Sequence, residues 1–329
     1  MRISRIAIAL LALAGCPGSR TLRDHDVRDS PGNGKANIPA IRALLDRYSP
    51  TASWVLRTED SVPRQFVFGR STLTLTSSGD FASYFDDGAV ENLAPYTSTA
   101  VHEMYHALSH RLGYQLQAEA RVAQPVDSEG FYISGAPQLV RYTIRYPARE
   151  MAETFPPDAR AFRFPTYVSP SSAIQGTQVD GVYGLLDEWA AYFHGSRTLV
   201  DLWPWIRDEA PRSREVYVKY RGRVFEIGVP HAEFKLFILH YLWHAKTHRP
   251  DVYRAVLANE SFRHAFREAD DAWSALLAEA AALEPAMVAI ASERGAGNIT
   301  FHRDAAYPNL LAHIASTKYQ EILVELRRD

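Results

Sequence analysis

The stretch VHEMYH at residues 101–106 holds two histidines four positions apart, with a glutamate directly after the first. Four residues are slightly more than one helical turn, so on a helix the rings of His102 and His106 can point at one ion. Neutral imidazole is a good ligand for Zn²⁺. Glu103 is rotated by about 100° from His102 around the helix, which leaves it outside the ligand set but able to take a proton from water on the metal. The motif predicts a Zn²⁺ site at His102 and His106, with Glu103 as the general base.

A catalytic Zn²⁺ has three protein ligands and one open position, so a third ligand must lie elsewhere in the chain. The metzincin arrangement would require Gly at position 109 and His at position 112, where this chain has Ser109 and Leu112. The other common arrangement takes a glutamate from a separate, later helix. The downstream glutamates considered for this role are Glu119, Glu129, Glu150, Glu153 and Glu188.

We choose Glu188 as the third ligand because its neighbours in GVYGLLDEWAAYFHG are apolar. This composition predicts a buried carboxylate, and a buried carboxylate needs a cation or several hydrogen-bond donors as partners. The alternative is that Asp187 and Glu188 form the solvated face of an amphipathic helix. Glu129 is the second choice, since the Gly and Ser residues around it favour a loop.

VHEMYHALSHRLG together with LLDEWAAY resembles the gluzincin group of zinc metallopeptidases, including bacterial envelope proteins of that type. The resemblance implies a zincin-like fold, a Zn²⁺ cofactor and hydrolysis of peptide bonds in peptide or protein substrates. In many gluzincins an Asp four residues after the glutamate ligand orients the first histidine. This chain has Tyr192 at that position, and we expect its hydroxyl to take the role.

Peptide hydrolysis also needs a hydrogen-bond donor for the oxyanion of the tetrahedral intermediate. Tyr and His usually fill this role in the chemistry of such sites, and Tyr183, Tyr192, His194 and His231 are candidates. We place Tyr192 and His231 in the catalytic set, since His231 opens a helix after Gly228 and Pro230. A surface position at the helix end is the alternative for His231. A second row of histidines, His240, His244 and His248, indicates either another metal site or the polar face of a helix.

The elements that position these residues follow from the sequence periodicity. TSTAVHEMYHALSHRLGY predicts a helix with Thr97 or Ser98 as N-cap, Gly113 as the C-terminal stop, and a buried stripe formed by Val101, Tyr105, Leu108 and Leu112. RQFVFGRSTLTLTSSG before it and QLVRYTIRY after it favour strands, and the second half has helical periodicity. The predicted class is α+β and zincin-like, with a small sheet and the motif helix in a first lobe and a mainly helical second lobe.

The first twenty residues, MRISRIAIALLALAGCPGSR, are typical of a bacterial export signal. The apolar run is shorter than the ~20 residues that a membrane-spanning helix needs. Leu13 to Cys16 resembles a lipobox, in which the cysteine becomes the acylated first residue. Cys16 is the only cysteine of the chain, which suits lipidation, although an ordinary secretory signal with an incidental cysteine is the alternative. Pro17, and not Asp, follows the cysteine, and the resemblance to enteric lipoproteins then implies the outer membrane, facing the periplasm or the surface.

The sequence therefore predicts a signal peptide with a lipidated cysteine over residues 1–16, a flexible tether over 17–36, and a zincin-like domain over 37–329 whose cleft lies near 102–106 and 188. With 36 basic and 38 acidic residues, the chain offers no electrostatic reason to expect a nucleic-acid partner. The predicted function is that of a membrane-anchored zinc metallopeptidase. The alternatives are a non-catalytic zinc-binding scaffold lipoprotein, a lipoprotein with a coincidental motif, and a hydrolase of cell-wall peptides.

Overall fold

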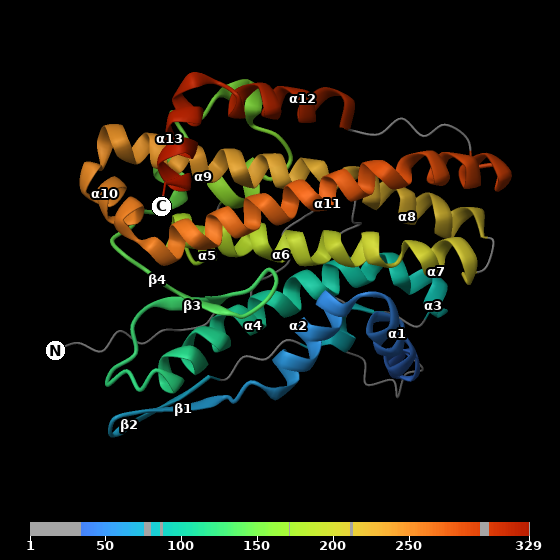
Figure 1. Ribbon diagram of the computed structural model, residues 1–329, viewed down its shortest axis with the longest axis horizontal. Helices are drawn as coiled ribbons and strands as arrows, with labels where there is room; N and C mark the ends of the chain where they lie inside the picture. Colours follow the sequence, from blue (N-terminus) through green and yellow to red (C-terminus); the bar gives the residue numbers. More distant parts are fainter. Residues whose placement is uncertain are drawn as a thin grey trace.

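Two long helices, α4 (Thr97–Glu119) and α6 (Val182–Asp201), pack against each other in the middle of the molecule (Figure 1). This computed structural model describes residues 34–75, 80–85, 88–170, 172–210, 213–296 and 303–328. Helix α4 carries VHEMYH and α6 carries Glu188. Their packing brings two motifs that are far apart in the sequence to one place.

A glycine permits the close approach of these two helices. A Cβ atom on Gly195 of α6 would lie 2.6 Å from the backbone oxygen of Ser98 in α4 and 3.6 Å from Cβ of His102. The predicted stripe of α4, formed by Val101, Tyr105, Leu108 and Leu112, is buried as expected. The helix that carries the histidines is therefore fixed on one side by its apolar stripe and on another by backbone contact with α6.

The ends of α4 differ from the sequence prediction. The N-cap is Tyr96, because the helix continues directly from a 3₁₀ turn, η2 (Ala94–Tyr96). The Thr97 and Ser98 hydroxyls donate hydrogen bonds back to carbonyls of that turn, at 2.6 and 3.2 Å. At the other end α4 runs on to Glu119 through Gly113, where a Cβ atom would lie 3.0 Å from the backbone of Glu129. Gly113 thus serves close packing rather than helix termination.

Two antiparallel hairpins flank α4. Strands β1 (Gln65–Phe68) and β2 (Ser71–Thr74) pair before it, which confirms the small sheet predicted there. Strands β3 (Ser128–Phe131) and β4 (Gln138–Arg141) pair after it, and β3 packs against α4. The segment QLVRYTIRY is a strand only as far as Arg141. Glu129 lies in β3 and not in the loop that its glycine and serine neighbours favoured.

Helices dominate the rest of the described chain. The coarse α+β class is confirmed, because the structure is mostly helical and includes two two-stranded sheets. Helix α1 begins at Gly34, inside the range predicted as a tether, and Cys16 lies outside the described residues. The remaining elements are α1 (Gly34–Tyr48), α2 (Pro50–Ser61), η1 (Phe81–Tyr84), α3 (Val90–Leu93), η3 (Ala148–Met151), η4 (Pro157–Ala159), the π-turn η5 (Phe164–Val168), α5 (Gly176–Val179), α7 (Trp203–Asp208), α8 (Arg214–Glu226), α9 (Gly228–His248), α10 (Pro250–Ala258), α11 (Glu260–Glu293), α12 (Arg303–Ile314) and α13 (Thr317–Arg327).

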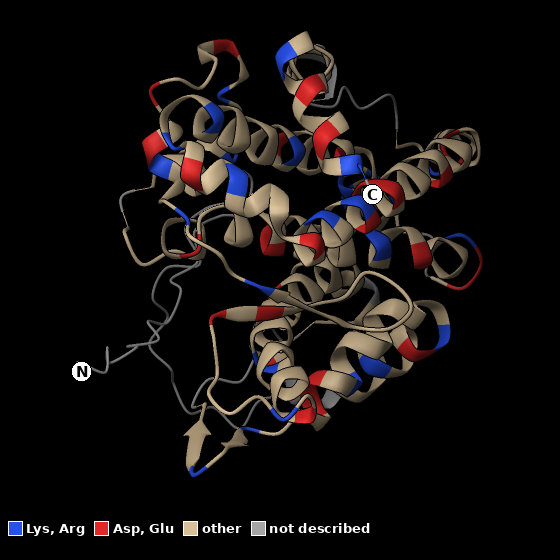
Figure 2. Ribbon diagram, turned by 60° about the vertical axis from the view of Figure 1, so that its left-hand side comes forward, with Lys and Arg blue, Asp and Glu red and all other residues tan. Residues whose placement is uncertain are grey.

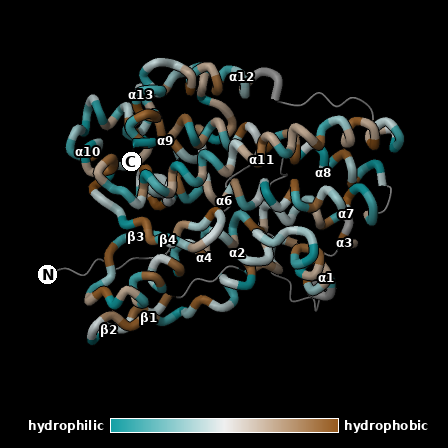
Figure 3. The backbone as a smooth tube through the Cα atoms, in the orientation of Figure 1, coloured by the Kyte–Doolittle hydropathy of each residue, from teal (hydrophilic) through white to brown (hydrophobic). Residues whose placement is uncertain are grey.

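Helix α6 is buried on nearly all sides. Helices α9 and α11 cover the faces of α6 that α4 leaves open, and Trp189 of α6 meets Phe266 of α11 in the core. The tube in Figure 3 shows hydrophobic residues interspersed with hydrophilic ones along these helices. A carboxylate on α6 is therefore placed in apolar surroundings, where it needs a partner.

Charged residues of both signs are interspersed over the outer helices, and no face of a single sign stands out in the view of Figure 2. Within the described residues, α11 is the one helix that is long and apolar enough, by length and composition, to cross a membrane. Phe262, Phe266 and Trp273 of its first half are buried in the core, whereas only 17% of its most apolar 18-residue window is buried.

Replacing Gly195 by alanine tests the contact between α4 and α6. The new methyl group would press on the Ser98 carbonyl, and overpacking of this kind costs about 1–3 kcal/mol. We expect Gly195→Ala to lower the midpoint of thermal unfolding measured by circular dichroism. Gly176→Ala is the matched control, because a Cβ there meets no atom within 4 Å. Equal stability of the two variants would contradict the close approach.

Candidate metal centre

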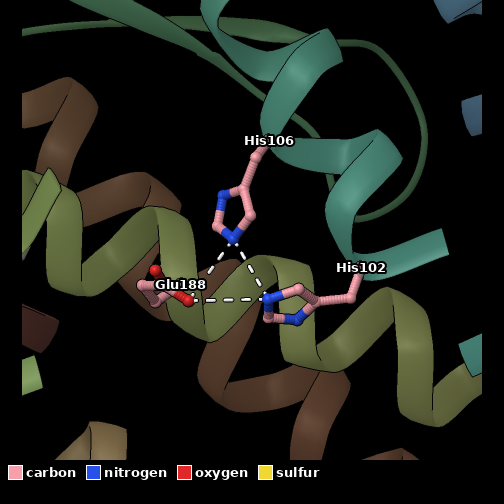
Figure 4. A group of neighbouring side chains, drawn as sticks. All are labelled: His102, His106 and Glu188. Atoms are coloured by element: carbon pink, nitrogen blue, oxygen red, sulfur yellow. Dashed lines mark hydrogen bonds and ion pairs between the residues drawn. The ribbon is translucent and has the colours of Figure 1, made fainter. Parts of the chain in front are cut away.

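His102 and His106 of α4 and Glu188 of α6 point toward one another (Figure 4). The Nε2 atoms of the two histidines are 3.1 Å apart, and Oε2 of Glu188 lies 3.6 Å from that of His102 and 3.3 Å from that of His106. All three donor atoms lie within 4.8 Å of one another, so the group could hold a metal ion. In the described part of the chain, this is the one group of three or more His, Cys, Asp or Glu side chains with that property.

The surroundings of Glu188 fit a cation at this position. Its residue surface is 9% exposed, as the apolar neighbours in the sequence predicted. Among the described residues, its Oε2 atom is buried and has no hydrogen-bond partner. Burying a carboxylate oxygen without a partner costs several kcal/mol, which a bound cation would offset. The alternative of a solvated Asp187–Glu188 face is wrong for Glu188.

Asp187 orients the second histidine. Its Oδ2 atom is 2.6 Å from Nδ1 of His106, and its Oδ1 accepts a hydrogen bond from the Ser109 hydroxyl at 2.7 Å. A carboxylate on Nδ1 fixes the tautomer that leaves the Nε2 lone pair directed at the other donors. Sequence analysis had considered Asp187 only as part of a solvated face. Its position directly before the chosen glutamate was the available signal.

Tyr192 lies beside the first histidine. Its ring contacts the His102 ring edge to face, with centroids 4.4 Å apart, and its hydroxyl lies 3.2 Å from that of Tyr167. The His102 ring also makes a hydrogen bond to the backbone of Ala191. Tyr192 is thus next to the ligand, as its spacing from Glu188 predicted, and the recorded contact is made by its ring.

The other candidate donors contact residues outside the ligand group. His231 is buried between the rings of Trp189 and Trp273, so the alternative of a surface position is wrong, and its Nε2 lies 3.9 Å from Asp270. His194 hydrogen bonds the carbonyl of Tyr132 at 2.7 Å. The Tyr183 hydroxyl contacts Thr143 and Asn259. Within the described chain, none of these partners is His102, His106 or Glu188.

Glu129, the second choice as ligand, is a buried strand residue that accepts a hydrogen bond from the Tyr142 hydroxyl at 3.2 Å. Burial raises its pKa well above the usual value, and the nearby charge of Asp187 raises it further. Of the other glutamates considered, Glu119 accepts from Gln115 and Glu150 pairs with Arg249. The structure brings Glu188, and none of these, into the ligand group.

The surroundings shift the pKa values of the two histidines in opposite directions. Burial lowers the pKa of His102, and the charge of His106 lowers it further. Burial also opposes charge on His106, but Glu188 and Asp187 outweigh it and raise the pKa of His106 well above its usual value. The two carboxylates therefore create a place where positive charge is favoured, which is what a cation site requires.

Glu103 lies at the edge of the cluster. Its Oε1 atom is 3.9 Å from Nε2 of His102, and its side chain is 25% exposed. Burial raises the pKa of Glu103, His106 opposes the shift, and Glu188 and Asp187 add to it. A carboxylate with a raised pKa is a stronger base for catalysis near neutral pH.

The second histidine row is a buried hydrogen-bond network. Both His240 and His244 contact the Thr154 hydroxyl, and Nδ1 of His240 lies 2.7 Å from the Tyr319 hydroxyl. Burial lowers the pKa of His240 to about 3, so this ring is neutral. The row joins α9 to α13 and to Thr154 in the turn after η3. The polar-face explanation is wrong for His240 and His244 because both are buried.

An open hollow of about 480 Å³ lies elsewhere, between the β3–β4 connection and α11. Its polar groups contact one another: Glu268 accepts from Ser134 and Gln138, and Asp271 pairs with Arg327. No ligand of the metal group lines it. The chemistry of the described chain is concentrated at the cluster and not at this hollow.

Comparison of the chain with models of known families, with curated proteins and with solved structures found no match. The site must therefore be interpreted from its own geometry.

The third ligand can be tested by paired substitutions. Glu188→Gln keeps the shape of the side chain but replaces a charged ligand by a neutral amide, so we expect the metal content of the purified protein to fall. Glu129→Gln, a second buried glutamate, should leave the metal content unchanged. Elemental analysis by mass spectrometry measures both. The reverse result would transfer the ligand role to Glu129.

Asp187→Asn tests the orienting carboxylate. Loss of such a partner lowers metal affinity about 10–100-fold, measured by competition with a chromogenic chelator. Asp201→Asn is the control, because Asp201 is on the same helix and bonds Ser49 and Arg197 instead. An Asp187→Asn affinity equal to that of the Asp201 variant would show that His106 needs no orienting group.

Proposed function

We propose that this chain is a zinc-dependent metallopeptidase with His102, His106 and Glu188 as ligands and Glu103 as general base. The observation that carries the proposal is the buried Glu188 oxygen that accepts no hydrogen bond from the described residues and faces two imidazole nitrogens at 3.3 and 3.6 Å. Zinc bonds of ~2.0–2.2 Å in a tetrahedron put pairs of ligand atoms about 3.3–3.5 Å apart. The observed separations of 3.1, 3.3 and 3.6 Å fall around that value.

Zn²⁺ supplies a Lewis acid that polarises the scissile carbonyl and lowers the pKa of a coordinated water to about 7. The residues of the chain do the rest. Glu103 accepts the proton of the attacking water and later delivers it to the amine nitrogen of the leaving group. Asp187 and Ser109 hold His106 in the required tautomer. The Glu103 side chain is 25% exposed, which supports a role in meeting substrate.

An envelope location is part of the proposal and is supported by the sequence alone. The export signal and the lipobox at Leu13 to Cys16 support a lipid anchor. These residues lie outside the described part of the chain. The site would then act on peptides or proteins in the periplasm or at the cell surface.

Glu103→Gln tests the catalytic function. The amide keeps the shape and removes the base, so we expect wild-type zinc content with hydrolysis of a fluorogenic peptide mixture reduced by about 10² or more. Glu119→Gln, on the same helix, is the control and should retain full activity.

An unchanged rate in Glu103→Gln would show that Glu103 is not the base. A wild-type protein that binds zinc but cleaves neither peptides nor cell-wall peptide stems would instead be a zinc-binding scaffold. Cleavage of the stems alone would assign the cell-wall substrate.

A further inference from the structure

One phenol, Tyr192, lies beside His102, and a second, Tyr167, lies beside Tyr192. The Tyr192 ring contacts the His102 ring, and the Tyr192 hydroxyl lies 3.2 Å from the Tyr167 hydroxyl. Tyr167 belongs to the π-turn η5 and was not among the donors considered from the sequence. Burial, followed by the charge of Glu188, raises the pKa of Tyr167, so its hydroxyl is within electrostatic reach of the ligand carboxylate.

A buried ion pair holds the start of this turn. Glu233 of α9 is 0% exposed and accepts two hydrogen bonds from Arg163, one from the backbone N–H at 2.8 Å and one from the guanidinium at 2.7 Å. The guanidinium carbon lies 4.6 Å from the centroid of the Tyr192 ring. Buried ion pairs add little net stability because desolvation offsets attraction. The Arg163–Glu233 pair is better explained by its effect on position, because it holds the start of η5 in place.

The ion pair of Arg163 and Glu233, called the clamp below, also fixes the backbone of Tyr167. The Arg163 carbonyl accepts from the Tyr167 N–H at 2.9 Å, and the Tyr167 carbonyl accepts from Thr177 at 2.7 Å and Gln178 at 3.0 Å. Glu233 therefore anchors Arg163, and Arg163 anchors Tyr167. The backbone of Tyr167 is therefore held at both its N–H and its carbonyl, which fixes where the phenol side chain begins.

Hydrogen-bond direction distinguishes the two phenols. The Arg163 guanidinium lies over the Tyr192 ring and carries only hydrogen-bond donors, so it cannot accept the Tyr192 proton. Tyr192 can then donate to Tyr167, which leaves the Tyr167 proton for another acceptor. Among the described residues, the Tyr167 hydroxyl has no hydrogen-bond partner except Tyr192. In such a chain each bond strengthens the next.

We propose that Tyr167 is a further catalytic residue, whose phenol donates a hydrogen bond to the substrate oxygen that becomes negative during hydrolysis, and that Arg163 and Glu233 are its positioning residues. The inference rests on the proposed peptidase function. As water attacks, its oxygen bonds to the carbonyl carbon, its proton passes to Glu103, and the carbonyl π electrons move to oxygen. The C–N bond then breaks and Glu103 returns the proton to nitrogen. Tyr167 keeps its proton throughout, since a phenol has a pKa of about 10.

Tyr167→Phe tests the catalytic role. Removing one oxyanion donor lowers kcat by about 10²–10³, and we expect KM and zinc content to stay at wild-type values. Binding of a phosphinic peptide, a tetrahedral analogue, should weaken in calorimetry without any turnover. Tyr253→Phe is the control, because it removes another buried hydroxyl, on α10, outside the site.

Glu233→Gln tests the clamp. We expect faster amide hydrogen exchange over residues 163–168 in the metal-free chain, and a lower kcat with KM little changed. In the double variant with Tyr167→Phe, the second substitution should cause no further loss of kcat, because Glu233 acts through Tyr167. Additive losses would reduce Glu233 to a structural residue and overturn its positioning role.

The outcomes separate the two proposals. Peptide hydrolysis by the wild type with an unchanged kcat in Tyr167→Phe overturns this inference and leaves the peptidase standing. A wild type that takes up no zinc overturns the peptidase and the role of Tyr167 together. Unchanged exchange over 163–168 in Glu233→Gln overturns the clamp in either case.

Discussion

The contact between α4 and α6 is the constraint on which the metal group depends. Gly195 lets α6 approach the backbone of α4 at Ser98, and further along the same pair of helices Glu188 meets His102 and His106. The donor atoms are separated by 3.1–3.6 Å, so a wider spacing of the helices would leave three side chains that no single ion could join. Sites of this kind tolerate displacements of only about 0.5 Å.

The burial of α6 strengthens the electrostatic effect of its carboxylates on the histidines of α4. Apolar helices α9 and α11 surround the face of α6 opposite α4, and His231 lies between Trp189 and Trp273 there. His231, a candidate catalytic residue in the sequence, instead packs against the residue that follows Glu188. Because these side chains are largely buried, the charges of Asp187 and Glu188 act strongly on His106.

The sequence predicts the candidate ligand group better than it predicts the surroundings of that group. The spacing of His102 and His106 and the apolar neighbours of Glu188 are local signals, and the structure brings these three residues together. The strands β1 and β2 were likewise readable from alternation. Gly113 was misread as a helix end because its role, close packing against Glu129, depends on a strand that is remote from the helix signal. Tyr167 gave no signal at all, since a π-turn in a Pro- and Ser-rich connection has no periodicity and its anchor, Glu233, lies in a distant helix.

Asp187 and Glu188 are consecutive residues of one helix, yet one carboxylate meets the outer nitrogen of His106 and the other faces its inner nitrogen. Two adjacent side chains of the same helix thus contact the two nitrogens of the His106 imidazole. A rotation of α6 about its axis would carry both carboxylates in the same sense, drawing one toward the ring as the other leaves it. Ligand and orienting group cannot be adjusted separately, so selection acting on either one constrains the angular setting of the whole helix.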